Sequence, residues 1–320
     1  MSPADLIESE ENGFRQEGLG LAETLPRREI RIREKQLPHA DPRQTKVAQG
    51  IAFLERDHVL AVTLMYNFPG VRTPQRRSLR YLIDTDNGDV IAIVDSFSLG
   101  MGRTGAGGAV GAKYLSRRDS RSVGVLGAGR QARVQLRYLL QVRKISRAYA
   151  CGRTPSKTQA FCNEMGKELG IDVSPAETVG SMKNRIDILV TTTPSYKPLV
   201  FAESMTPGLH VNIIGADDPP KIELDAGALK KADKIVIAAE DSLLSGQFAI
   251  PMSERKFTRE QVYGRIGEIT AGLKPGRERD DEITVFHNPG LTLEDVASGY
   301  RAYQKAKQLG LGREVPDPFA

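Results

Sequence analysis

Cysteine, tryptophan and long apolar runs are scarce or absent in this chain. None of its 320 residues is tryptophan, and only two are cysteine. Cys151 and Cys162 are too few for a disulfide framework and lack the spacing of a metal site, so we expect no metal and a reducing, cytoplasmic setting. No run of about 18 apolar residues predicts a membrane span. The acidic start, which has no apolar core, predicts no signal peptide.

The charge pattern gives little support to a nucleic-acid partner. The formal net charge is +5, and arginines cluster at Arg72, Arg76, Arg77 and Arg80. However, 40 acidic residues are spread among the basic ones and only 6% of the chain is aromatic, so no stacking platform is evident. We expect most of these arginines to be solvated, and leave open that a few face an anionic small molecule.

The first third of the chain is predicted to form a mostly antiparallel sheet beside a helix. Ser2 and Pro3 are typical of a helix start. Residues 28–35 alternate as in a strand, residues 59–68 form an apolar run rich in β-formers, and residues 79–95 have the pattern of a hairpin.

Residues from about 104 onward predict a parallel sheet. Small residues over 104–115 favour a closely packed linking helix. Strands then alternate with helices, which is typical of an α/β domain. The expected strands are 122–126, 146–151, 186–191, 209–214, 234–238 and 282–286, and the expected helices are 130–142, 156–169, 225–230 and 292–309. The predicted fold class is therefore α/β, with a Rossmann-type doubly wound parallel sheet plus a second, α+β domain that contains a mostly antiparallel sheet.

A glycine-rich turn between an expected strand and an expected helix is the most specific motif. Residues 121–132 have the sequence RSVGVLGAGRQA. Gly127 permits a tight turn, Gly129 lets the backbone approach a pyrophosphate, and Ala132 keeps the helix close to the sheet. The helix N-terminus offers free N–H donors to phosphate. The motif predicts a dinucleotide cofactor, with a plain tight turn as the alternative.

The loop after the second expected strand of the parallel sheet, residues 146–151, bears on the choice between NAD and NADP. Dinucleotide folds usually carry an acidic residue there that binds the ribose hydroxyls. Here the loop contains Arg153, Thr154 and Lys157 and no acid. These side chains suit a 2′-phosphate, so we expect NADP(H) as the preferred cofactor. NAD(H) is the alternative, because some NAD enzymes also lack the acid.

Three further segments carry residues suited to binding or catalysis. Thr192 lies in a hydroxyl-rich loop after an apolar strand, where ligands bind in such sheets, although a helix cap is an equal alternative. Arg103 stands between the two halves and is suited either to a carboxylate clamp or to a structural salt bridge. Asp217 and Lys221 follow a core strand and are suited either to proton transfer or to helix entry. His287 is expected to be a surface or packing residue and not an acid–base group.

Several of these segments together resemble the ornithine cyclodeaminase/mu-crystallin family, over about residues 25–305. The resemblance rests on Arg103-Thr104-Gly105-Ala106, on Gly127-Ala128-Gly129-Arg130-Gln131-Ala132, on Gly215-Ala216-Asp217-Asp218-Pro219-Pro220-Lys221-Ile222-Glu223-Leu224 and on residues 286–295. It implies a dinucleotide-binding domain at 105–291. It also implies a substrate-binding and dimerisation domain at 1–104, completed by 292–320, that builds a homodimer.

The resemblance further implies roles for individual residues. Asp217 matches the catalytic aspartate, with Lys221 in the same loop. Arg103 matches the arginine that grips the substrate carboxylate, and Arg28 is expected to be a second such arginine. The residues expected to contact the cofactor are Gly127, Gly129, Arg130, Gln131, Ala132, Arg153, Thr154, Thr104, Thr192 and Asn288.

One position departs from the family pattern. The family places a lysine that helps hold the substrate carboxylate where this chain has Thr63. A buried carboxylate without a partner is costly, so either another cation replaces the lysine or the substrate differs. Arg72, Arg76 and Arg77 are the candidates, and we assign Thr63 and Arg76 to the substrate site.

The expected function is that of an NAD(P)H-dependent oxidoreductase. It would transfer hydride to or from the C=N or C–N carbon of a small imino or amino acid that carries a carboxylate, as an imine reductase or amino-acid dehydrogenase. One alternative is an ammonia lyase of the ornithine cyclodeaminase type that recycles its NAD; Arg153 and Thr63 argue against it. The other is a mu-crystallin-like, NADPH-dependent binding protein; Asp217 and Arg103 argue against it.

Overall fold

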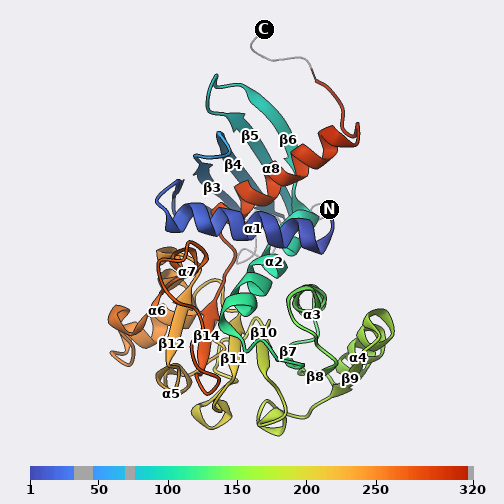
Figure 1. Cartoon of the computed structure of the whole chain (residues 1–320), viewed down its shortest axis with the longest axis vertical. Helices are drawn as coiled ribbons and strands as arrows, with labels where there is room; N and C mark the ends of the chain where they lie inside the picture. The colour runs from blue at the N-terminus through green and yellow to red at the C-terminus, as the bar shows by residue number, and fades with distance from the viewer. Residues whose placement is uncertain (32–45, 69–75, 316–320) are drawn as a thin grey trace.

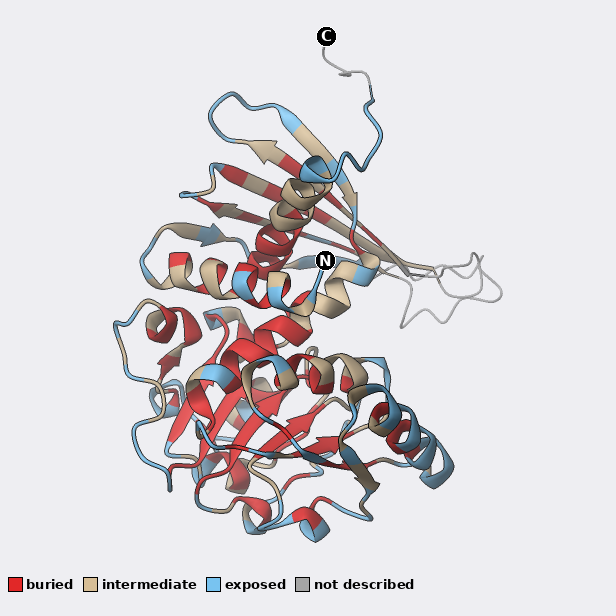
Figure 2. Cartoon of the chain, turned by 45° about the vertical axis from the view of Figure 1, so that its right-hand side comes forward, coloured by how far each residue is buried: buried red, intermediate tan, exposed pale blue. Residues whose placement is uncertain are grey.

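The computed structural model describes residues 1–31, 46–68 and 76–315, which form two sheets joined by a long helix (Figure 1). The helix is α2 (Phe97–Leu115). Buried residues concentrate in α2 and in the larger sheet (Figure 2). The two predicted sheet types, one antiparallel and one parallel, are confirmed.

The first sheet is antiparallel. Its strands pair in the order β1-β3-β4-β5-β6, and β2 also pairs with β3. The strands are β1 (Ala22–Thr24), β2 (Arg28–Arg31), β3 (Lys46–Leu54), β4 (Val59–Asn67), β5 (Arg76–Asp84) and β6 (Val90–Asp95). β5 and β6 form the predicted hairpin. Strands β1 and β3 were not predicted, and residues 32–35 of the predicted first strand lie outside the described residues.

Helices cover one face of this sheet. α8 (Thr292–Gln308) packs across β3, β4 and β5, and α1 (Pro3–Gly18) packs against α8 (Figure 1). Ser2 caps α1, because its hydroxyl accepts a hydrogen bond from the N–H of Asp5 at 3.1 Å. Side chains alternate along a strand, so Arg80 and Leu82 of β5 face α8 together and are both buried. An arginine therefore takes a core position in this sheet.

The second sheet has eight strands that are all parallel. They pair in the order β13-β12-β14-β11-β10-β7-β8-β9. The strands are β7 (Ser122–Leu126), β8 (Arg147–Cys151), β9 (Asp172–Pro175), β10 (Ile188–Thr191), β11 (His210–Ile213), β12 (Lys234–Ile237), β13 (Gly264–Arg265) and β14 (Thr284–His287). The order β9-β8-β7-β10-β11-β14 is that of a dinucleotide-binding fold, whose ligand site lies at the switch between β7 and β10. Strands β9 and β13 were not predicted.

The helices around the parallel sheet follow the predicted pattern in part. The predicted ones are α3 (Arg130–Val142), α4 (Pro155–Leu169) and α5 (Ala226–Lys230). Two short helices were not predicted, α6 (Gly246–Ser253) and α7 (Ile266–Thr270). Among the residues described, no helix has the length and apolar character needed to cross a membrane.

The glycines of α2 allow it to lie close to its neighbours. A Cβ atom on Gly105 would lie 2.4 Å from Cγ1 of Val134 on α3, and one on Gly111 would lie 2.1 Å from the ring of Phe286 on β14. Only glycine fits at these two contacts. The predicted domain boundary between residues 104 and 105 falls inside this continuous helix.

Candidate active site

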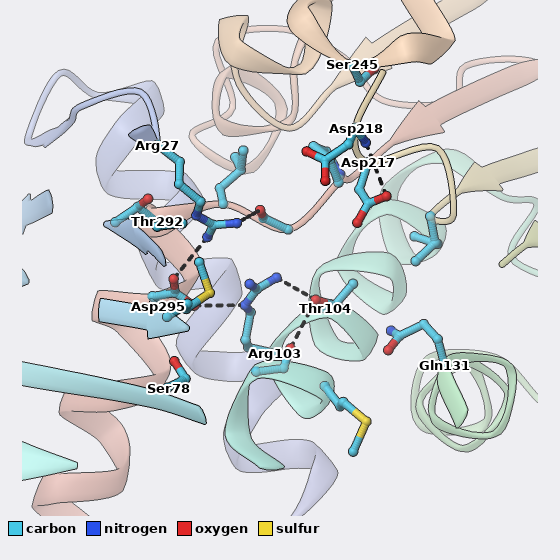
Figure 3. Close-up of a pocket in the computed structure, with 18 of the residues that line it drawn as sticks. Arg27, Ser78, Arg103, Thr104, Gln131, Asp217, Asp218, Ser245, Thr292 and Asp295 are labelled. Atoms are coloured by element: carbon cyan, nitrogen blue, oxygen red, sulfur yellow. Dashed lines mark hydrogen bonds and ion pairs between the residues drawn. The ribbon is translucent and has the colours of Figure 1, made fainter. Parts of the chain in front are cut away.

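A cavity of about 640 Å³ is lined by strands of the first sheet, by helices α2 and α8 and by loops that follow strands of the second sheet (Figure 3). Its lining includes β3, β4, β5, α2, the glycine turn, the loops after β10 and β11, and the start of α8. The predicted site residues that line it are Arg103, Thr104, Gly129, Arg130, Gln131, Thr192, Asp217 and Lys221. The fold thus gathers residues that are up to about a hundred positions apart in the sequence.

The glycine turn has the geometry of a phosphate-binding turn. Gly127 has a φ of 111°, which only glycine adopts readily, and a Cβ atom there would lie 2.6 Å from Oγ1 of Thr192. A Cβ atom on Gly129 would meet no atom of the described chain within 4 Å. No packing contact therefore accounts for Gly129, whereas the close approach of a pyrophosphate does.

The N-terminus of α3 supplies the donors for that phosphate. Gly129 is the N-cap of α3 and has no side chain to cap it, so the first N–H groups of the helix keep their donor capacity. Nε2 of Gln131 is buried and has no hydrogen-bond partner in the described part of the chain. Ala132 is buried, as its packing role requires. These features fit a dinucleotide.

The loops after β10 and β11 form the floor of the cavity and are tied together by one side chain. Thr192 donates its hydroxyl to the carbonyl oxygen of Leu126 at 3.1 Å, next to the glycine turn. Thr193 and Gly215 both donate to the buried carboxylate of Glu223. Thr192 therefore has its place in a ligand-facing loop, and no helix begins at this loop.

Asp217 and Lys221 lie on the loop after β11. Their side chains form an ion pair. Burial would lower the pKa of Lys221, but the Asp217 carboxylate outweighs it and raises that pKa. The alternative that Asp217 begins a helix is wrong, because Asp225 caps α5 by accepting the N–H of Ala228 at 2.6 Å. Asp217 therefore does not cap a helix, and it lines the cavity.

Asp295, on the first turn of α8, is the centre of a buried arginine cluster. Its Oδ1 accepts hydrogen bonds from Arg80 at 2.7 Å and from Nε of Arg103 at 3.0 Å, and its Oδ2 accepts one from Arg27 at 3.1 Å. Burial would raise the pKa of Asp295, but the three guanidinium groups lower it to about 2. Figure 3 shows Arg27 and Arg103 converging on Asp295, with Asp217 elsewhere on the cavity wall.

Two further carboxyl groups near this cluster are less readily ionised. Burial raises the pKa of Glu294 and raises the pKa of Glu10 well above its ordinary value. Glu294 still accepts a bond from Arg103 at 3.3 Å. Three arginines thus converge on Asp295, the carboxylate of this cluster whose pKa is lowered, and Arg27 and Arg103 line the cavity beside it.

Arg103 has one of the two roles that the sequence left open. It forms the structural salt bridges to Asp295 and Glu294, and Nη1 also donates to Thr104. None of these bonds uses Nη2 of Arg103. The salt-bridge interpretation is therefore correct, and the carboxylate clamp remains open to Nη2.

Thr63 has a cationic neighbour on the next strand. It pairs Cα to Cα with Arg80 across β4 and β5. Thr63 is buried and its hydroxyl has no hydrogen-bond partner among the described residues. Arg80 lines the cavity, whereas Thr63 does not. Arg80 therefore supplies a cation on this part of the sheet, and Arg77, one of the candidates named from the sequence, also lies on β5 and lines the cavity.

Other predicted site residues lie away from the cavity lining. Arg28 is exposed, and its neighbour Arg27 lines the cavity instead, since successive residues of an extended chain point to opposite sides. Asn288 is buried, and its amide bonds Glu294 and Gly290.

Two predicted cofactor-binding residues lie outside the cavity lining, and the side chains of two arginines named from the sequence cannot be placed. Arg153 and Thr154 lie at the carboxyl end of β8, outside the lining, and Arg153 is exposed. Arg72 and the side chain of Arg76 lie outside the described residues.

Sequence reasoning missed Arg27, Arg80, Asp295 and the role of Glu223. A signal existed for two of them. Arg80 lies two residues before Leu82 on an expected strand, so both side chains are expected on the same, apolar face. Asp295 lies one turn after Leu291 at the start of an expected helix. A charged residue on a face expected to be buried indicates a paired or ligand-binding group.

No group of His, Cys, Asp and Glu side chains suited to a metal ion occurs within residues 1–31, 46–68 and 76–315. His287 is buried and packs edge-on against Phe248, as expected for a packing residue. The site is therefore built from guanidinium, carboxylate, hydroxyl and backbone groups.

The fold and site define a two-sheet protein of the dinucleotide-binding class, with a cavity beside the glycine turn. The ornithine cyclodeaminase/mu-crystallin family model matches residues 2–309, and the chain belongs to this family. The resemblance drawn from the sequence is thereby confirmed.

Named relatives are similar along most of the chain. Alanine dehydrogenase of Archaeoglobus fulgidus is 38% identical over 250 residues, which cover 77% of this chain and 76% of that protein. The structure of Thermococcus litoralis Delta(1)-pyrroline-2-carboxylate reductase with NADH and L-proline matches with a TM-score of 0.88 and 31% identity, over 98% of this chain and 96% of that one. An archaeal alanine dehydrogenase dimer with bound NAD matches with a TM-score of 0.89 and 32% identity, over 99% and 95%. These relatives are reductases and dehydrogenases, which agrees with the expected oxidoreductase.

Proposed function

We propose that this chain is a pyridine-nucleotide-dependent reductase or dehydrogenase of a small imino or amino acid that carries a carboxylate. The observation that carries the proposal is the charge layout of the cavity. Arg27 and Arg103 stand at one part of the wall, and Asp217 stands on the loop after β11. An amino or imino acid has a carboxylate at one end and a protonated nitrogen at the other, so its two charges match these two parts.

The arginines would hold the substrate carboxylate. Nη2 of Arg103 is unused by the bonds to Asp295, Glu294 and Thr104. Arg27 lines the cavity and takes the place that we expected for Arg28. Because Asp295 fixes both guanidinium groups, they meet the carboxylate without losing much side-chain freedom.

Asp217 would exchange a proton with the substrate nitrogen. Its carboxylate accepts that proton when the amine is oxidised and returns it when the imine is reduced. Lys221 stays protonated beside it, because the ion pair raises the pKa of Lys221. The ion pair therefore holds the Asp217 carboxylate in place on the cavity wall.

A nicotinamide nucleotide would lie against the glycine turn and supply the hydride that the reaction transfers. Gly127, Gly129 and the N-terminus of α3 would hold its pyrophosphate, and Thr192 and Gln131 would lie along it. We propose NADP(H) as the preferred form. Arg153 at the carboxyl end of β8, with no acid beside it, supports that preference, while the two solved relatives named above hold NAD or NADH.

The outer face of the first sheet supports a homodimer. Apolar residues on that sheet remain exposed, among them Ile30, Val90 and Ile93, which are 72%, 44% and 55% exposed. Exposed apolar side chains on a sheet face without a covering helix are typical of an interface. We propose that a second copy covers this face and that residues 1–104 with 292–320 form the substrate-binding and dimerisation domain. The two buried, free cysteines suit the cytoplasm that we propose as its location.

A substrate screen tests the function. Purified protein is offered cyclic imino acids, keto acids with ammonia or amines, and the matching amino acids, each with NADH and NADPH. Oxidation of the reduced nucleotide by at least one carboxylate-bearing imine supports the proposal. Activity only with substrates that lack a carboxylate contradicts it.

The same assay separates the two alternatives. An ammonia lyase of this family would release ammonia from ornithine with no net change in the reduced-nicotinamide absorbance. A binding protein would bind NADPH tightly and oxidise it with none of the substrates. Either result would overturn the reductase proposal.

A further inference from the structure

Glu223 is a fully buried carboxylate outside the cavity lining, yet it bonds the cavity floor. Its Oε1 accepts hydrogen bonds from the N–H and the hydroxyl of Thr193, at 2.6 and 2.7 Å. Its Oε2 accepts the hydroxyl of Thr191 at 2.7 Å and the N–H of Gly215 at 2.9 Å. The four donors come from the last residue of β10, from the loop after β10 and from the loop after β11.

The two loops touch at this point. A Cβ atom on Gly215 would lie 2.4 Å from the backbone nitrogen of Thr193 and 2.8 Å from Oε1 of Glu223. Glycine is therefore required for the loops to approach and share one carboxylate. Downstream of Gly215 the second loop carries Asp217, and upstream of Thr193 the first loop carries Thr192.

Glu223 is itself held from the other side. The backbone N–H groups of Glu223 and Leu224 donate to Oε1 of Gln247 on α6, at 3.1 and 3.0 Å. Nε2 of Gln247 donates to the carbonyl oxygen of Leu224 at 2.9 Å. The backbone carbonyl oxygen of Glu223 also accepts a hydrogen bond from the N–H of Val200 at 3.0 Å. Hydrogen bonds to Gln247 and Val200 thus hold the backbone of Glu223 in place, and its carboxylate positions the two loops.

We propose that Glu223 is a positioning residue that fixes the nucleotide-side loop, with Thr192 and Thr193, relative to the proton-exchanging loop, with Asp217. The inference rests on the proposed function. Transfer between a nucleotide and a substrate requires the two reaction partners to be placed within fractions of an ångström, and a misplacement of about 1 Å costs about a hundredfold in rate. A single buried acceptor that bonds both loops meets that requirement.

Glu223→Gln tests the inference with little change in shape. The amide has one acceptor oxygen and one donor NH2 group. The NH2 group therefore faces either the N–H and hydroxyl of Thr193 or the hydroxyl of Thr191 and the N–H of Gly215, and it cannot accept their hydrogen bonds. We expect kcat to fall about a hundredfold and the Kd of NADH or NADPH to rise about tenfold. The KM of the substrate stays within about threefold, because Arg27 and Arg103 bind the carboxylate on another wall.

Glu282→Gln is the matched control. Glu282 is an equally buried carboxylate at the start of β14, where it accepts the N–H of Glu278 at 3.0 Å. It lies outside the cavity lining. We expect this variant to lose thermal stability but to keep kcat and the nucleotide Kd within about twofold. An equal loss of kcat in both variants overturns the positioning role, as does an unchanged kcat in Glu223→Gln.

Thr191→Val keeps the test decisive if Glu223→Gln does not fold. It removes one of the four donors from a buried strand residue and leaves the carboxylate in place. A fall in kcat of about threefold or more, with weaker nucleotide binding, supports the inference, and wild-type values overturn it. The nucleotide Kd is measured without substrate. A wild-type protein that binds nucleotide but reduces no imine would therefore contradict the proposed function and not the loop placement.

Discussion

Thr63 on β4 and Arg80 on β5 are directly paired across the first sheet, and both are buried. The family resemblance places a lysine at position 63, and this chain has its cation on the neighbouring strand instead. Directly paired residues of antiparallel strands have Cβ atoms about 5 Å apart on the same face of the sheet. Arg80 therefore places a cation on the same face of the sheet as Thr63, and it bonds Asp295 at 2.7 Å.

Arg80→Met should weaken substrate binding. It removes one cation from the cluster around Asp295, so Arg27 and Arg103 must neutralise that carboxylate with less charge left for a ligand. We expect the KM of the carboxylate substrate to rise at least about tenfold, with an unchanged nucleotide Kd. Steady-state kinetics and nucleotide titration measure both.

The double variant Thr63→Lys with Arg80→Met is the control for this prediction. A lysine on β4 returns a cation to the same face of the sheet, so the KM should recover most of its loss. If Arg80→Met loses only thermal stability and keeps its KM, Arg80 serves packing alone and the prediction is wrong.

Asp217→Asn should remove most of the turnover. An amide cannot accept the proton that the carboxylate exchanges, and general acid–base catalysis contributes about a hundredfold to ten-thousandfold in rate. NADPH binding should change little, because the glycine turn is left intact. The adjacent Asp218→Asn is the comparison and should retain far more activity. Equal losses of turnover and of NADPH affinity in Asp217→Asn would disprove the assigned role.

Arg153→Ala should change the nucleotide preference. If the guanidinium binds the 2′-phosphate, the Kd of NADPH rises about tenfold or more and that of NADH stays within about twofold. Fluorescence titration with both nucleotides measures the change. Arg147→Ala, at the opposite end of β8, is the control. A ratio of the two Kd values that stays the same would mean that the phosphate binds elsewhere.

His287 should make the protein less stable in acid. Burial lowers its pKa from the ordinary 6.5 to about 4. Between these values the unfolded chain binds a proton that the folded chain does not. The free energy of unfolding therefore falls as the pH drops from 6.5 towards 4, by up to about 1.4 kcal/mol per pH unit from this residue.

His287→Gln removes that contribution. Denaturant unfolding at several pH values should show a shallower loss of stability below pH 6.5 than in the wild type. An identical pH dependence in wild type and His287→Gln would show that the buried imidazole is not the source.

The class of fold and the position of the glycine turn could be predicted from the amino-acid sequence. The spacing of Gly127, Gly129 and Ala132 between a strand and a helix is a local pattern, and so is the alternation of strands and helices that follows it. Local patterns predict local geometry, because backbone conformation and side-chain periodicity act over a few residues. The family resemblance, carried by short contiguous motifs around Arg103 and Asp217, followed for the same reason.

Only the tertiary structure decided which charges meet. Arg80 and Asp295 are separated by 215 positions in the chain, and Glu223 receives its donors from two different loops. Whether a charged side chain is exposed or paired in the interior depends on which elements pack against it, and the energy of a buried charge depends on those partners. The spacing of residues along the chain does not show which elements pack together. The arginine cluster around Asp295 and the hydrogen bonds to Glu223 could therefore be found only in the folded structure.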